Sequence, residues 1–354
     1  MRVGIVGANS QVGTELTALF AEQDGVTVAP IVRNRLGTHF LRHLGIQCRV
    51  ADVTDDEDAT KALADIDVVV IAAFAWQYSQ EGFEARGARK ANENIVSNTV
   101  EHAPGGARIV YFSSQAAYGD GINAPQYTDW SLYTREKHNA EKVLRKSCEG
   151  TNKRGYAFRL GFVHGPNQSR TKVLQDGLSA DSHVYIVTDP DKPSNVIHTV
   201  TLRDAILQCG STNVPSGAYS LTNEPQWTWG RVCEYYSPDD VTLHYRPPGD
   251  STSWFKKLLG KGWSIVEDRQ RTLRTATVYV PDIVNEWLFN KYLQQQRGGE
   301  LSTIESRKSL DRPAFKFDPM PGSNVPGLPS TESRLDALAT IRDYFEEEHP
   351  RTQT

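Results

Sequence analysis

The first thirteen residues restrict the fold of this chain more than any other segment. Residues 3–6 read Val-Gly-Ile-Val, a largely apolar run that suits a parallel strand buried on both faces. Gly7 allows a tight turn after this strand, and a helix is predicted to begin near Val12. Such a helix directs its free N–H groups and the positive end of its dipole at an anion. Gly13 would let the helix pack closely on the sheet, so the segment predicts a strand, a phosphate-binding turn and a helix.

The spacing of this segment departs from a full glycine motif at one position. Ser10 stands where a middle glycine would let the backbone approach a pyrophosphate, but serine is small and its hydroxyl can donate to phosphate. An ordinary glycine turn after a buried strand is the alternative interpretation. We expect the turn and the start of the helix to contact a dinucleotide through Gly7, Asn9, Ser10, Gln11, Val12 and Gly13.

Short apolar runs alternate with longer amphipathic ones as far as residue 166. The predicted strands after the first cover 26–32, 47–50, 68–71, 108–112 and 156–160. The predicted helices between them cover 12–23, 55–64, 82–102 and 131–146. Strands that alternate with helices indicate right-handed crossovers and a parallel sheet covered on both faces. The predicted fold class is therefore α/β, a doubly wound parallel sheet of the Rossmann type with a smaller carboxy-terminal α/β substrate lobe.

The regular alternation stops after residue 166, which suggests a second unit. The predicted division is a dinucleotide-binding domain over 1–166, to which 195–222 returns, and a substrate-binding lobe formed by 167–194 and 223–354. Amphipathic patterns predict helices over 282–296 and 334–348. Proline and glycine between them predict a long surface loop over 307–330.

Composition excludes several classes of partner. The net charge of −4, with no basic block, argues against a nucleic-acid partner. The chain has no long apolar run, so no membrane partner is expected. Four scattered cysteines indicate neither a metal site nor a disulfide framework. The N-terminus leads directly into a strand without a secretory leader, so the expected location is cytoplasmic and the expected partner is a small-molecule substrate.

A serine, a tyrosine and a lysine downstream of the glycine turn form the candidate catalytic set. Tyr133 and Lys137 are predicted to lie one turn apart on the same face of a helix. A tyrosine with an ordinary pKa of about 10 is a poor base at neutral pH, and a nearby ammonium group stabilises its phenolate. Ser114 is expected at the carboxyl end of a strand, the edge where parallel sheets bind ligands. This layout indicates hydride transfer to or from a carbinol carbon.

The order of these motifs resembles the extended short-chain dehydrogenase/reductases, the family of nucleotide-sugar epimerases, dehydratases and reductases. The resemblance covers about residues 1 to 225 and rests on segments 7–13, 52–53, 71–73, 112–119, 133–137, 159–166 and 196–199. It implies that Tyr133 is the acid/base, that Lys137 tunes it and anchors a cofactor ribose, and that Ser114 holds the substrate oxygen. It also implies cofactor contacts from Asp52, which would bind the adenine amino group, and from Val53, Ala72, Ala73, Asn92, Phe162 and Val163.

The end of the second predicted strand bears on which cofactor is bound. It reads Val32-Arg33-Asn34-Arg35, where an NAD-preferring relative would place an acid to bind both ribose hydroxyls. Arginine suits a 2′-phosphate because its guanidinium pairs with phosphate bidentately. We therefore expect NADP(H), with NAD(H) as the alternative if Arg33 and Arg35 only form a solvated turn.

Two further departures concern the substrate. Gln115-Ala116 follows Ser114 where the dehydratases of the family carry Asp-Glu, so a dehydratase is not expected. Phe162 replaces an asparagine that commonly contacts the substrate or its diphosphate, which suggests that the substrate is not an ordinary nucleotide sugar. The predicted substrate contacts are Ser114, Gln115, Trp76 and Phe162.

Three functions fit these patterns. The favoured one is an NADP(H)-dependent reductase of a carbonyl, on a nucleotide-linked sugar, in which Tyr133 protonates the oxygen. The second is an NAD(P)-dependent epimerase that keeps its cofactor tightly bound. The third is a non-catalytic dinucleotide sensor, which the presence of all three catalytic residues disfavours. A homodimer through the helices at 82–102 and 131–146 is the expected assembly.

Overall fold

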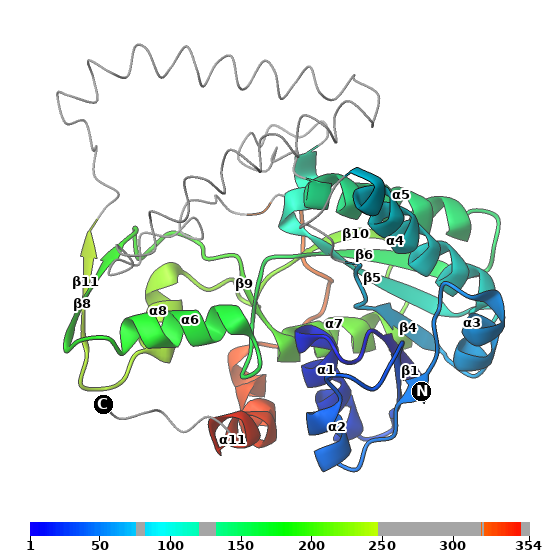
Figure 1. Cartoon of the computed structure of the whole chain (residues 1–354). Coiled ribbons are helices and arrows are strands. Elements are labelled where there is room, and N and C mark those ends of the chain that lie inside the picture. Colours follow the sequence, from blue (N-terminus) through cyan, green and yellow to red (C-terminus); the bar gives the residue numbers. More distant parts are fainter. Residues whose placement is uncertain (76–81, 120–131, 247–319, 321, 348–354) are drawn as a thin grey trace, which may run out of the picture.

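The computed structural model describes residues 1–75, 82–119, 132–246, 320 and 322–347. Its centre is a seven-stranded sheet in the order β10-β6-β5-β4-β1-β2-β3, and every pairing in it is parallel. The strands are β1 (Arg2–Val6), β2 (Thr27–Val32), β3 (Arg49–Val50), β4 (Val68–Ile71), β5 (Arg108–Ser114), β6 (Arg154–Leu160) and β10 (Gly217–Leu221). The prediction of a doubly wound parallel α/β sheet is confirmed (Figure 1).

Helices cover both faces of this sheet (Figure 1). They are α1 (Gln11–Ala21), α3 (Asp56–Leu63), α4 (Gly82–His102), α5 (Leu132–Cys148) and α7 (Thr199–Ser211). The central strand β4 shows how the core is divided: Val68 and Val70 pack with the side that carries α1 and α7, whereas Val69 and Ile71 pack with α3, α4 and α5. All four side chains are fully buried, which explains why β4 is apolar throughout instead of alternating. Burial of each contributes about 1.5–3 kcal/mol.

The remaining elements lie outside the seven-stranded sheet, and two of them pack on its helices. Two small parallel sheets pair β7 (Phe162–His164) with β9 (Val196–His198), and β8 (His183–Val187) with β11 (Thr242–Arg246). The helical elements are α2 (His39–His43), α6 (Ser169–Leu178), α8 (Trp229–Tyr236), the 3-10 helices η1 (Gln115–Gly119) and η5 (Glu332–Leu338), and α11 (Ala339–Glu347). Helix α2 contacts α1, and η5 contacts α7. Within the described part of the chain, no helix is both long enough and apolar enough to cross a bilayer.

Several sequence predictions differ from these elements. Neither α2 nor the two small sheets had been predicted, because the elements are too short to show a clear hydrophobic period. The terminal helix begins at Ala339, and η5 takes the place of its predicted first turn. The predicted helix over 282–296 and most of the predicted loop over 307–330 lie outside the described residues. The strand β10, within 195–222, pairs with β6 in the main sheet, and the division into two domains stays a prediction.

A buried carboxyl group joins α1 to the loop that follows β7. The side chain of Glu15 is fully buried. Its Oε1 accepts from the Asn167 backbone N–H at 2.7 Å and from Gln168 Nε2 at 2.8 Å, and its Oε2 accepts from Thr199 Oγ1 at 2.6 Å. Gly165 leaves room for it, because a Cβ there would lie 2.0 Å from Glu15 Oε2. Burial raises the pKa of Glu15 to about 7, although the three hydrogen bonds act in the opposite direction.

Candidate active site

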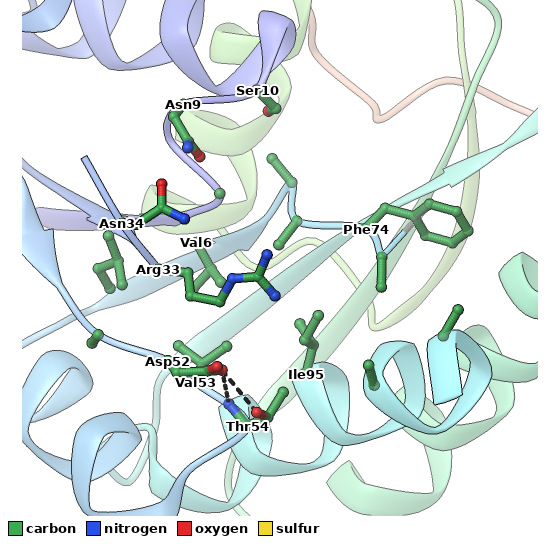
Figure 2. A pocket seen from close by; sticks show the side chains of 18 of the residues that line it. Val6, Asn9, Ser10, Arg33, Asn34, Asp52, Val53, Thr54, Phe74 and Ile95 are labelled. Carbon is green, nitrogen blue, oxygen red and sulfur yellow. Dashed lines mark hydrogen bonds between the residues drawn. The ribbon is translucent and has the colours of Figure 1, made fainter. Parts of the chain in front are cut away.

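A cavity of about 650 Å³ lies at the carboxyl ends of the sheet strands (Figure 2). Its walls come from the residues that follow β1, β2, β3 and β4, and from one side of α4. The order of the strands reverses between β1 and β4, which is the position where open parallel sheets bind ligands. Nine residues predicted to bind a cofactor line it: Gly7, Asn9, Ser10, Arg33, Asn34, Asp52, Val53, Ala72 and Ala73.

The turn between β1 and α1 packs closely against neighbouring backbone, which requires glycine at two positions. Gly7 has φ of +84°, and a Cβ at this position would lie 2.6 Å from the Ala73 backbone nitrogen. A Cβ on Gly13 would lie 2.3 Å from the Gly7 carbonyl oxygen. Ser10 caps α1, because its Oγ accepts from the Gly13 N–H at 3.0 Å. The serine that interrupts the glycine motif therefore forms the start of the helix, and the positive end of α1 faces the cavity.

The end of β2 places one of its two arginines at the cavity. The Arg33 side chain extends from the β2 end into the cavity, opposite Asp52 (Figure 2). The adjoining turn is held by Asn34, whose Oδ1 accepts from the Leu36 N–H at 3.0 Å, and by Asn9, whose Nδ2 donates to the Leu36 carbonyl at 2.8 Å. Arg35 does not line the cavity. The structure thus separates two residues that looked equivalent in the sequence.

Asp52 and the alanines after β4 form the other walls. Asp52 Oδ1 accepts from the Thr54 N–H at 3.0 Å and from Thr54 Oγ1 at 2.7 Å, which fixes the carboxylate at the cavity wall. The N–H groups of Ala72 and Ala73 both donate to the Val6 carbonyl at 2.9 Å. These hydrogen bonds join the residues after β4 to the end of β1. The side chains of Ala72 and Ala73 are small, so the cavity extends up to this part of the backbone.

Other residues predicted to contact a cofactor lie away from this cavity lining: Gln11, Val12, Gly13, Arg35, Asn92, Phe162 and Val163. Gly13 lies under the turn, and Phe162 and Val163 belong to β7, beyond β6. Asn92 is buried behind the wall: its Oδ1 accepts from the Ala75 N–H at 2.7 Å, and its Nδ2 donates to the Ala75 carbonyl at 3.2 Å and to Glu136 Oε2 at 2.9 Å. The two hydrogen bonds to the Ala75 backbone fix the position of the segment that follows β4.

Ser114 and Tyr133 meet at the carboxyl end of β5. A hydrogen bond joins the two side chains and lowers the pKa of Tyr133. Burial has the larger, opposite effect and raises the pKa of the phenol, so Tyr133 is protonated at neutral pH. Ser114 Oγ also accepts from the Ala116 N–H at 3.2 Å, at the start of η1.

Lys137 is buried beside this pair. Its Nζ donates to the Phe112 carbonyl at 2.6 Å and lies 5.8 Å from the centre of the Tyr133 ring. Phe74 covers it, with its ring centre 4.3 Å from Nζ and 5.5 Å from the Tyr133 ring centre. Burial lowers the pKa of Lys137 to about 7. Because Phe74 also lines the cavity, it connects the cavity to Tyr133 and Lys137, two of the candidate catalytic residues.

Two charged residues near Tyr133 had not been identified from the sequence. Glu136 is buried on the same helix, bonded to Asn92, and burial raises its pKa to about 7. Arg170, the second residue of α6, has a charge that lowers the pKa of Tyr133. The sequence could have indicated Glu136, because it is adjacent to Lys137. Arg170 lies 37 positions from Tyr133 in the sequence and belongs to no recognised motif.

The predicted substrate contacts lie in two places. Gln115, directly after Ser114, is buried, and its Oε1 has no hydrogen-bond partner among the described residues. Phe162 is buried against Trp229, with ring centres 6.2 Å apart. Trp76 lies outside the described residues. An unpartnered buried acceptor beside Ser114 favours a ligand with a hydrogen-bond donor at that point.

Comparison with known proteins gives a family match for one part of the chain. Residues 7–150 match the family model described as NAD(P)H-binding. This segment contains every residue that lines the cavity except Val6, together with Ser114, Tyr133 and Lys137. No curated protein matches the chain in sequence.

Solved structures share the fold at low sequence identity. UDP-glucuronic acid 4-epimerase from Bacillus cereus, in complex with NAD, has a TM-score of 0.52 and 17% identity over 70% of this chain and 88% of that one. UDP-glucose 4-epimerase from Thermotoga maritima, with UDP-glucose, has a TM-score of 0.52 and 14% identity over 71% of this chain and 87% of that one. UDP-N-acetylglucosamine 4-epimerase from Bacillus cereus has a TM-score of 0.51 and 16% identity over 73% and 90%.

These similarities define the class of fold. The chain has a segment that matches an NAD(P)H-binding family model, and its parallel sheet shares the fold of these nucleotide-sugar epimerases. The resemblance inferred from the motifs is confirmed at this level.

Proposed function

We propose that the chain is an NADP(H)-dependent oxidoreductase of the extended short-chain type that reduces a carbonyl, with Tyr133 as the acid. The observation that carries the proposal is the continuity of the cavity with the catalytic set. Phe74 lines the cavity and contacts both Tyr133 and Lys137, and Ser114 bonds to Tyr133 beside them. A dinucleotide in the cavity would therefore end close to the Ser114–Tyr133 pair.

The residues present fit such a dinucleotide. Gly7 allows the tight turn that brings the start of α1 to the cavity, where a pyrophosphate would lie, and Asp52 lines the same cavity, where it would bind an adenine. The cofactor would supply or accept a hydride. Ser114 would hold the substrate oxygen, and the protonated Tyr133 phenol would donate its proton to that oxygen. Lys137 would hold the ribose and then stabilise the resulting phenolate.

Arg33 supports the choice of NADP(H). Its guanidinium enters the cavity where a 2′-phosphate would lie, and no carboxylate comes from this strand end. We expect Arg33→Met to weaken NADPH binding roughly tenfold to a hundredfold, because a charge-assisted hydrogen bond contributes about 1.5–3 kcal/mol. NADH binding should stay unchanged. Isothermal titration with both cofactors measures this.

Arg35→Met is the matched control for Arg33→Met, since Arg35 belongs to the same turn but lies outside the cavity lining. It should leave both affinities as in the wild type. Equal loss of NADPH affinity in the two variants would indicate a general effect of charge. A higher affinity of the wild type for NADH than for NADPH would favour NAD(H).

The proposed substrate is a carbonyl on a nucleotide-linked sugar, the ligand class named for the structures of similar fold. An epimerase is the second candidate, and the two differ in how they use the cofactor. An epimerase must keep its dinucleotide through the cycle, whereas a reductase releases it and consumes NADPH. The purified protein should therefore carry little bound dinucleotide and should oxidise added NADPH with a keto-sugar nucleotide. Stoichiometric bound cofactor with no net NADPH consumption would select the epimerase.

The proposal includes a small-molecule substrate and a homodimer. Helices α4 and α5 lie side by side on one face of the sheet, where a partner could continue the helical layer (Figure 1). A non-catalytic sensor is disfavoured because the hydrogen bond between Ser114 and Tyr133 and the burial of Lys137 have no use in binding alone.

A further inference from the structure

The backbone around Phe74 is held at two points. On one side, the Ala73 N–H donates to the Val6 carbonyl at 2.9 Å, which ties the segment after β4 to the end of β1. On the other side, the Asn92 side chain of α4 brackets Ala75: its Oδ1 accepts from the Ala75 N–H at 2.7 Å, and its Nδ2 donates to the Ala75 carbonyl at 3.2 Å. Asn92 therefore fixes the second of the two points.

Glu136 of α5 sets the orientation of the Asn92 amide. The residue is buried, and its Oε2 accepts from Asn92 Nδ2 at 2.9 Å. A carboxylate only accepts hydrogen bonds, so it must face the Nδ2 end of the amide, and Oδ1 is then turned toward the Ala75 N–H. The charged groups that act on Glu136 come from α4 and from its own helix, and they are Arg89, Glu93 and Lys137.

These contacts form a closed circuit that begins and ends on neighbouring residues of α5. Phe74 lines the cavity (Figure 2), and its ring centre lies 4.3 Å from Lys137 Nζ and 5.5 Å from the centre of the Tyr133 ring. The circuit runs from Glu136 through Asn92 and the segment after β4 to Phe74, and it returns to α5 at Lys137. Release of that segment would move the Phe74 ring away from Nζ and admit water to the ammonium group.

We propose that Glu136 is a positioning residue for the catalytic set: by orienting Asn92, it holds Phe74 over Lys137. This inference rests on the proposed function, in which Lys137 holds the cofactor ribose and stabilises the Tyr133 phenolate. A cation acts more strongly on a nearby phenolate where water is excluded, so the cover over Lys137 contributes to turnover. Glu136 itself contacts neither cofactor nor substrate in this scheme and acts through Asn92.

The first test separates the hydrogen bond of Glu136 from its charge. Glu136→Gln is the conservative variant: its Oε1 can still accept from Asn92, so kcat should stay within about threefold of the wild-type value. Glu136→Leu removes the acceptor and should lower kcat roughly tenfold to a hundredfold, because small displacements of groups around a reaction have effects of this size. Equal losses in the two variants would show that the charge acts, and would overturn the inference.

A double-mutant cycle tests the path through Asn92. Asn92→Leu should lower kcat at least as much as Glu136→Leu, and the double variant should lose no more than Asn92→Leu alone, because the two residues act as one unit. Additive losses would mean that Glu136 acts on Lys137 directly. Glu93→Leu is the matched control: it removes a carboxylate of α4 that acts on Glu136 and accepts from Arg89 Nε at 3.0 Å, and it should keep kcat.

A titration of Lys137 gives a readout that does not depend on turnover. NMR of protein with isotope-labelled lysine follows this group, and Lys137→Met identifies its signal. Burial lowers the pKa of Lys137 to about 7, whereas the charge of Glu136 raises it. Both Glu136 variants lack that charge, so a higher pKa of Lys137 in Glu136→Leu than in Glu136→Gln reports that Phe74 has moved and water has entered. If Glu136→Leu fails to fold, Asn92→Ala gives the comparison against the wild type.

The outcomes separate this inference from the proposed function. Equal pKa values of Lys137 and equal kcat values in Glu136→Gln and Glu136→Leu would contradict the inference alone. Absence of NADPH consumption by the wild-type protein would contradict the proposed function, and the titration would then still decide whether Glu136 holds Phe74 over Lys137.

Discussion

Tyr133→Phe is expected to lower kcat by about a hundredfold to ten-thousandfold, the usual contribution of a general acid. The phenol is hydrogen-bonded to Ser114 and protonated at neutral pH because burial raises its pKa. Phenylalanine keeps the ring that packs against Phe74, so the cavity wall should not change. The dissociation constant for NADPH should therefore stay within about twofold of the wild-type value, since the loss falls on the transition state alone. Steady-state kinetics and titration with NADPH measure the two quantities.

Tyr156→Phe is the matched control. Tyr156 is also fully buried and hydrogen-bonded, with its hydroxyl 3.1 Å from the Val214 carbonyl, but it lies near the opposite end of β6. It should lose some stability and keep kcat. Retention of wild-type turnover by Tyr133→Phe would remove Tyr133 from the mechanism.

Glu15→Gln is expected to remove the part of the loss of stability between about pH 4.5 and 7 that Glu15 causes in the wild-type protein, a window that Glu136 shares. The folded-state pKa of Glu15 is raised to about 7 from an ordinary 4.5, so over this range the folded protein binds the extra proton and the unfolded chain does not. The contribution of Glu15 to the free energy of unfolding therefore falls as pH rises, and this contribution levels off above about pH 7. A shift of this size corresponds to about 3 kcal/mol.

Glutamine can replace the neutral acid at this site. Its Oε1 accepts from the Asn167 N–H and from Gln168, and its Nε2 donates to Thr199 Oγ1. The variant should match the wild type near pH 4 and exceed it by about 3 kcal/mol near pH 8, as measured by urea unfolding. Glu22→Gln, an exposed change just beyond the end of α1, should reproduce the wild-type pH dependence. Parallel curves for Glu15→Gln and the wild type would show that Glu15 does not hold a proton in the folded state.

Local sequence patterns were sufficient to predict the central parallel sheet and the turn that follows its first strand. The apolar runs at β1 and β4 predict buried parallel strands, and the glycine at position 7 predicts the turn between β1 and α1, because burial on both faces and a positive φ each demand particular residues. The strand ends then place Arg33, Asp52 and Ala72 at one edge of the sheet, where the cavity lies. The proximity of Ser114, Tyr133 and Lys137 could be predicted for the same reason, since Ser114 ends a strand and Tyr133 and Lys137 share a helix face, whereas their catalytic role stays a prediction.

The rest depends on contacts between distant segments. Arg33 and Arg35 have the same chemistry in the sequence, and only the direction of the turn places one in the cavity. Arg170 approaches Tyr133 because β7 and α6 follow the carboxyl edge of β6, a path that no local pattern encodes. Glu15 shows the same limit: an acid in the middle of an amphipathic helix suggests solvent exposure, but Gly165 and Thr199 enclose it.

The central claim is that the cavity delivers a dinucleotide to Ser114 and Tyr133, and a crystal structure with NADP⁺ tests it most directly. The pyrophosphate should lie at the start of α1 beside Gly7 and Ser10, the 2′-phosphate on Arg33, and the nicotinamide ring next to Tyr133. A nicotinamide ring that lies away from Tyr133, or a dinucleotide bound outside this cavity, would contradict the account.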